Sequence, residues 1–161
     1  MDLTTQEILS MALTGTDEGD AAVGSQLLKG HTHRIKRFKG DGAYDKLGFR
    51  RSLEGGVEQV IPPPKGAVAR LSPKGETLPA HLVQRNEAVR YIQQHSLPKW
   101  KITQGDHQRS LNEVVMFRYK TIFGGELKVR TAENQVAEVK LKCLLLNTFR
   151  EIGMPISYKV A

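Results

Sequence analysis

The sequence predicts an α/β fold built around neighbouring parallel strands. Between residues 7 and 61 the sequence has the patterns of five elements, in which strands and helices alternate, beginning and ending with a strand. This succession is typical of α/β proteins whose sequential strands lie parallel. The chain has 161 residues, of which 39% are hydrophobic, enough for one domain with a core and too few for two of ordinary size.

The first two elements are expected to be a strand and a helix. Residues 7–14 alternate between apolar and polar side chains, which predicts a strand. Its apolar side chains share one face: Leu9, Met11 and Leu13. Thr16 and Asp17 offer N-caps for a helix that runs to about Lys29 and is closed by Gly30.

A second helix lies between two further predicted strands. The basic segment 34–40 is interpreted as a strand because of its neighbours. Asp45 is expected to cap a helix that ends at Gly55-Gly56, and residues 57–61 form the next strand before three prolines. The apolar residues of this helix recur at helical spacing: Leu47, Phe49 and Leu53.

The second half of the chain is predicted to be helical. Residues 62–79 are rich in Pro, Gly and Lys and indicate an exposed loop. Helices are expected over 85–95, ended by Leu97-Pro98, and from about His107 to Thr121.

The last helix has the clearest signals. Thr131 can cap it, and Gly153 followed by Pro155 ends it. Its apolar residues recur at helical spacing: Val136, Val139, Cys143 and Leu146.

Composition narrows the function classes. The chain carries 24 Lys+Arg against 17 Asp+Glu, a net charge of +7, and its pI is near 9.6, which favours polyanionic partners. A single cysteine, Cys143, excludes an internal disulfide and fits a reducing compartment. The sequence contains no apolar run of the ~20 residues that a membrane helix needs and no signal peptide, so we expect a cytoplasmic protein without a membrane partner.

The first candidate for chemistry is Asp41, in the glycine-flanked run Gly40-Asp41-Gly42 that follows a predicted strand. A carboxylate at a strand end can hold a metal, and the glycines let a phosphate backbone come near. The structural alternative is a turn whose Asp45 caps the next helix.

The second candidate lies on the helix expected from about His107. At 100° per residue, Arg109, Glu113 and Lys120 fall within about 40° of one another on its surface. The opposite side can face a core and carries apolar residues: Leu111, Val115, Tyr119 and Ile122. The structural alternative is a solvated face with a weak ion pair, although Arg before Glu is the poorer orientation for stabilising a helix.

Together the two segments resemble insertion-sequence transposases with a Tyr–Arg–Glu–Lys signature, in which two, three and six residues separate the four positions. Asp106, Arg109, Glu113 and Lys120 stand at these spacings, with Asp in place of Tyr, and 41–44 match the Asp-Gly-Ala-Tyr motif of the family's second acidic residue. Further similar segments are Val60–Gly66, Arg85-Asn86, Trp100-Lys101, Leu146-Asn147 and Gly153–Pro155.

The resemblance implies a ribonuclease H-like mixed sheet flanked by helices, with three acidic residues that hold two Mg²⁺ (or Mn²⁺) ions. Asp41 would be the second metal ligand and Glu113 the third, close together at one end of the sheet. Arg109 and Lys120 would grip DNA phosphates. A basic run would extend the DNA-binding surface, or else protect a solvated edge strand: Lys29, Arg34, Lys36, Arg37 and Lys39.

In such enzymes the first catalytic Asp lies on the first strand. By the resemblance, residues 1–161 are the C-terminal portion of the catalytic domain, lacking its first strands, from a truncated or split copy. We then expect the exposed sheet edge to favour self-association, and Asp106 in place of a neutral phenol to repel phosphate.

The function expected from this resemblance is DNA transposition, with terminal inverted repeats and target DNA as partners and a nucleoid-associated location. DNA binding by the chain itself should be independent of sequence and should weaken steeply with salt. Two alternatives stay open: a non-catalytic basic remnant that binds DNA weakly, and a metal-dependent nuclease that uses Asp17 or Asp20.

Overall fold

The computed structural model describes residues 1–15, 17–53, 56–72 and 76–153. They form two compact units. One comprises residues 14–109, and the other joins residues 1–13 to the part of the chain from residue 110 onward. Both strands of the described residues belong to the first of these units, and the last two helices of the described residues belong to the second. No helix of the described residues is long and apolar enough to span a lipid bilayer.

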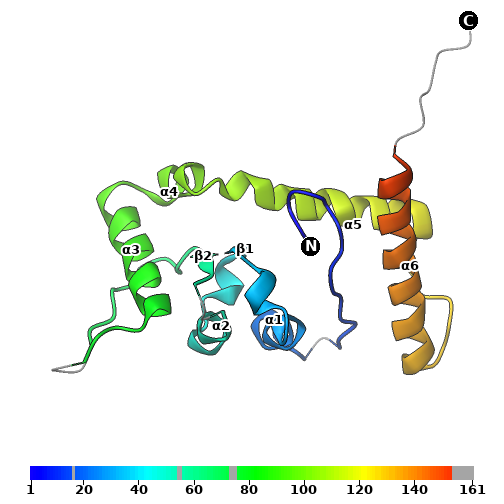
Figure 1. The fold of residues 1–161 in the computed structure, drawn as a ribbon, viewed down its shortest axis with the longest axis horizontal. Coiled ribbons are helices and arrows are strands. Elements are labelled where there is room, and N and C mark those ends of the chain that lie inside the picture. The colour runs from blue at the N-terminus through cyan, green and yellow to red at the C-terminus, as the bar shows by residue number, and fades with distance from the viewer. Residues whose placement is uncertain (16, 54–55, 73–75, 154–161) are drawn as a thin grey trace, which may run out of the picture. The chain divides into compact units, whose positions relative to one another are not determined.

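The unit of residues 14–109 alternates helices and strands as the sequence predicts (Figure 1). Its elements are, in order, α1 (Asp20–Leu28), a 3-10 helix (Thr32–Arg34), β1 (Arg37–Lys39), a 3-10 helix (Gly42–Tyr44), α2 (Leu47–Ser52), β2 (Glu58–Val60), α3 (Ala80–Gln94), α4 (Leu97–Thr103) and a 3-10 helix (Asp106–Arg109).

The sheet of this unit consists of β1 and β2 among the described residues. The strands pair in parallel, with Phe38 opposite Gln59. Successive side chains of a strand point to opposite faces, so Val60 and Ile61 belong to different cores. Ile61 joins a cluster with residues of α2 and its flanks, whereas Val60 packs with Ala88 of α3 and Trp100 of α4. Helices therefore cover both faces, and the predicted α/β fold is confirmed.

Aromatic rings between α1 and the sheet leave no room beside Gly24 of α1. A Cβ atom at Gly24 would come within 2.9 Å of the rings of Phe49 and Tyr44. These two rings pack with Phe38 of β1, at centroid separations of 5.0 Å and 5.6 Å from it. The absence of a side chain at Gly24 thus lets α1 approach this cluster.

We expect Gly24→Val to lower the free energy of unfolding by about 1–3 kcal/mol, because the rings must move to admit the side chain. The matched control is Gly48→Val in α2, where an added Cβ meets nothing within 4 Å. This control should change stability by less than about 0.5 kcal/mol. Urea unfolding of both variants measures the difference, and equal midpoints would contradict the tight packing of α1.

Several predicted boundaries of this unit are corrected. The N-cap of α1 is Gly19 rather than Asp17, the helix itself begins at Asp20, and Thr16 lies outside the described residues. Both strands are confirmed but shorter than predicted. The α3 helix begins at Ala80, and α4 is absent from the sequence prediction, which treats Leu97-Pro98 only as a helix end. Pro98 instead lies in the first turn of α4, where its missing N–H costs nothing.

In the other unit, α6 (Ala132–Ile152) crosses the C-terminal part of α5 (Ser110–Phe123; Figure 1). The predicted ends of α6 are confirmed: the Thr131 hydroxyl accepts a hydrogen bond from Asn134 N, and Gly153 adopts a φ of 84°. Pro155 lies outside the described residues.

The strand predicted over residues 7–14 is wrong, since this segment is neither strand nor helix. A strand needs a neighbouring backbone to pair with. Here the Asn147 side chain of α6 takes that place: its amide accepts from Ile8 N at 2.9 Å and donates to Ile8 O at 3.1 Å. Arg150 of α6 also donates to Thr5 O, so side chains of one helix hold this extended segment.

Candidate active site

Asp41 lies at the edge of the sheet where both parallel strands end. Gly40 N donates to Val60 O at 3.1 Å, extending the pairing of β1 and β2 by one residue. Asp41 then caps the following 3-10 helix, because its Oδ1 accepts from Ala43 N at 2.9 Å. Its side chain is exposed, so the carboxylate is accessible to a ligand from solvent.

Of the two glycines beside Asp41, close packing requires Gly40. A Cβ atom at Gly40 would lie 2.7 Å from the Phe38 ring and 3.0 Å from the Tyr44 ring. At Gly42 it would lie 3.6 Å from Pro62 O, which is ordinary contact. The turn that carries Asp41 therefore packs on an aromatic cluster and lies close to Pro62, the second residue after β2.

Asp45 does not cap α2, contrary to the sequence prediction, since the N-cap is Lys46 and makes no side-chain cap bond. The Asp45 carboxylate instead accepts from Arg50 Nε at 2.6 Å and from Arg85 Nε at 3.1 Å. The three side chains are 2%, 1% and 10% exposed. A buried carboxylate that pairs with two cations satisfies more of its hydrogen-bonding capacity than a helix cap would.

Arg50 connects this buried pair to β2. Its Nη2 donates to Ile61 O at 2.9 Å and its Nη1 to Gln59 Oε1 at 3.4 Å. Burial lowers the pKa of the Arg50 guanidinium, and the hydrogen bond that it donates to Asp45 opposes this shift. The network Asp45–Arg50–Arg85 thus fixes the turn of Asp41 to the end of β2. The sequence contained one sign of it: Arg50 interrupts an otherwise apolar helix face.

Glu113 lies in the first turn of α5 and is exposed. Lys120, also exposed, lies seven residues further along the same helix, which places it about 20° from Glu113 around the axis. Arg109 does not belong to this helix, because it ends the 3-10 segment Asp106–Arg109 of the other unit. The predicted stripe of three residues on one helix is therefore reduced to Glu113 and Lys120. On the opposite side Val115 is buried, but Ile122 is 49% exposed and faces no core.

Asp106 is buried, which the sequence did not indicate. It is 6% exposed, and its oxygens lie 3.6 Å from Lys101 Nζ and 4.0 Å from Arg109 Nε. The repulsion of phosphate expected from an acid at position 106 is opposed by these two cations. The Arg109 side chain contacts Asp106 and is also partly exposed to solvent.

Residues 1–148 match the family model of the transposase DDE domain. This chain belongs to that family. The match covers the turn of Asp41, the 3-10 segment with Asp106 and all of α5. No solved structure matches the chain.

The basic run of this transposase domain divides into paired and unpaired cations. Arg37 pairs with Glu58 across the two strands. Lys39 Nζ donates to Gly105 O at 2.8 Å and to Gln108 Oε1 at 2.7 Å, and burial lowers its pKa. The side chains of Arg34 and Lys36 are exposed and have no ion pair among the described residues. Lys29 is likewise exposed and without an ion pair there, so among the described residues these three cations of the run can meet a phosphate without losing a partner.

The acidic residues of the transposase domain are distributed over both units. Among the described residues, no three Asp, Glu, His or Cys side chains come together as a metal site. Asp41 belongs to the unit of residues 14–109 and Glu113 to the other. Asp20 is the first residue of α1, as expected for an acid that interacts with a helix N-terminus.

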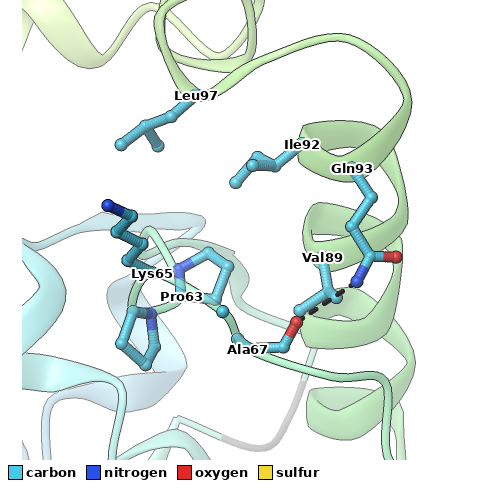
Figure 2. Close-up of a pocket in the computed structure, with 9 residues that line it drawn as sticks. Pro63, Lys65, Ala67, Val89, Ile92, Gln93 and Leu97 are labelled. Carbon is cyan, nitrogen blue, oxygen red and sulfur yellow. Dashed lines mark hydrogen bonds between the residues drawn. The ribbon is translucent and has the colours of Figure 1, made fainter.

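Figure 2 shows that the loop after β2 lies alongside α3. The hollow between them measures about 400 Å³ and is lined mainly by apolar side chains, among them Pro63, Val89 and Ile92. Gln93 Nε2 donates to Ala67 O at 3.3 Å across one end of it. The first part of the predicted exposed loop, residues 62–67, therefore packs against one helix.

Proposed function

We propose that this transposase DDE domain cleaves and joins DNA strands, with Asp41 and Glu113 as ligands of divalent metal ions. The observation that supports this most directly is the position of Asp41. In a chain that matches the family over residues 1–148, it is an exposed carboxylate at the carboxyl end of two parallel strands. Ligands of open α/β sheets bind at such edges.

The proposed ligand set fits Mg²⁺ or Mn²⁺. Both side chains are exposed carboxylates, and carboxylate oxygens are the donors that these hard cations prefer. Two such ions supply an activated nucleophile and stabilise the leaving oxygen in a displacement at phosphorus. The proposal requires the two units to bring Asp41 and Glu113 within about 10 Å of each other, the span of a two-metal cluster.

The cations next to these carboxylates are proposed to bind DNA. Lys120 shares the exposed face of α5 with Glu113, and Arg109 retains partial exposure beside Asp106. Arg34 and Lys36 would extend the contact, and Arg37 and Lys39 would take part after exchanging their present partners. The spacing of Asp106, Arg109, Glu113 and Lys120 supports membership of the Tyr–Arg–Glu–Lys branch and, with it, a ribonuclease H-like sheet.

We further propose that the first catalytic Asp is supplied by a segment outside residues 1–161. By the resemblance, the site needs three carboxylates, and the chain matches two of them. Two-metal transfer is impaired when one ion lacks a ligand. The partners would be the terminal inverted repeats and the target DNA of the element.

The test is end cleavage and strand transfer on a labelled terminal-repeat duplex with Mg²⁺ or Mn²⁺. We expect no products from the 161-residue chain and cleavage once an upstream segment with the further Asp is joined to it. Cleavage by the 161-residue chain alone would refute the proposal that the third carboxylate ligand comes from another segment. An inactive extended chain that still binds DNA would instead favour a basic remnant without catalysis.

A further inference from the structure

The loop after β2 is held to α3 by a buried amide. Asn86 of α3 is 1% exposed. Its Oδ1 accepts from Arg70 N and its Nδ2 donates to Arg70 O, both at 2.8 Å. A side-chain amide that satisfies both backbone groups of one residue replaces the pairing of a neighbouring strand. The backbone of Arg70 is thus fixed although its side chain is exposed.

Two further side chains of α3 hold the same loop. Arg85 Nη1 donates to Val68 O at 3.1 Å, and Gln93 reaches Ala67 O. Since Arg85 also pairs with Asp45, the buried network beneath the Asp41 turn continues into this loop. The loop also begins beside that turn, because Pro62 O lies next to Gly42.

The outward side of the loop is basic. A hollow of about 770 Å³ between the loop and the start of α3 has three charged residues in its lining, and all are cations: Lys65, Arg70 and Arg85. Lys65 and Arg70 are exposed, and neither side chain has an ion pair among the described residues. Residues 62–72 contain no acidic residue. This surface therefore presents two exposed cations, Lys65 and Arg70, that can bind an anionic ligand.

We propose that residues 62–72 form a preformed DNA-binding loop, in which Lys65 and Arg70 contact backbone phosphates next to the Asp41 edge. The inference rests on the proposed function, which supplies DNA as the polyanion. Fixing the loop before binding lowers the conformational entropy lost on association. Phosphate contacts of this kind position a duplex without reading its sequence.

The test measures binding of the full chain to a fluorescent duplex of arbitrary sequence between about 50 and 200 mM salt. The plot of log Kobs against log salt has a negative slope. Arg70→Gln and Lys65→Gln should each reduce the magnitude of this slope by about 1, since each removes one phosphate contact. Arg70→Lys should retain the slope because it keeps the charge. Charge-matched controls at other exposed positions, Arg90→Gln of α3 and Lys140→Gln of α6, should leave the slope unchanged.

An equal reduction of the salt slope in the loop variants and in the controls would overturn the inference, because binding would then depend on net charge alone. Unchanged slopes in Arg70→Gln and Lys65→Gln would also overturn it, yet leave the proposed function intact if the extended chain still cleaves DNA. A chain that binds no duplex at any of these salt concentrations, even when extended, would refute both.

Discussion

Glu113→Gln and Asp41→Asn, each in the extended enzyme, are expected to slow strand cleavage by at least about 10³-fold, or about 4 kcal/mol of transition-state stabilisation. Both changes nearly preserve the shape of the side chain and remove the negative charge that holds a metal ion. Because both carboxylates are exposed, neither change should disturb folding by more than about 0.5 kcal/mol.

The controls for this prediction are exposed acids that the proposal does not assign to the site, one in each unit. Glu87→Gln on α3 serves the unit of Asp41, and Glu133→Gln at the start of α6 serves the unit of Glu113. Single-turnover cleavage at saturating DNA gives the rate of each variant, and calorimetric titration with Mn²⁺ gives its metal affinity. Rates of the Asp41 or Glu113 variants within threefold of these controls would show that the carboxylate concerned is not a metal ligand.

Asp45→Ala should destabilise the unit of residues 14–109 by about 3–5 kcal/mol, the cost of leaving buried charge without its partner. Two guanidiniums, those of Arg50 and Arg85, would remain in the interior without the carboxylate between them. The turn that carries Asp41 would also lose its link to β2 and α3.

The matched control is Glu58→Ala, which breaks the pair with Arg37. Those side chains are 44% and 52% exposed, and such a surface pair contributes about 1 kcal/mol or less. Urea unfolding followed by the fluorescence of Trp100, which is buried in the core beside β2, measures both losses in the same unit. A loss for Asp45→Ala no larger than that for Glu58→Ala would contradict a structural role of the buried network.

Local features of the structure could be predicted from the sequence wherever neighbouring residues decide them. The period of apolar residues predicted α6, and its ends follow from Thr131 and Gly153, which act through the backbone beside them. The turn of Asp41 and the strand before the three prolines were predicted for the same reason, whereas the strand in segment 34–40 was inferred only from the elements on either side of it. Glycine, proline and alternating apolar residues restrict the conformation of the next few residues only.

Features that depend on distant residues were decided by the tertiary structure. Residues 7–14 have the alternation of a strand but pair with the Asn147 side chain, 139 positions away from Ile8. Asp45 has the sequence position of a helix cap, but its carboxylate pairs with two arginines, one of them 40 residues away. Arg109 and Glu113 have the spacing of one helix face, but the helix begins only at Ser110.

The physical reason is that burial and charge pairing outweigh local preference. A helix cap contributes about 1 kcal/mol, whereas an unpaired buried charge costs several times more. The carboxylate of Asp45 therefore goes to the buried guanidiniums whatever the local pattern suggests. By itself, the sequence determined the family, the exposed carboxylates and the basic character of the chain. Which cations are free to meet DNA, and which residues hold the turn of Asp41, depended on the pairings made in the folded unit.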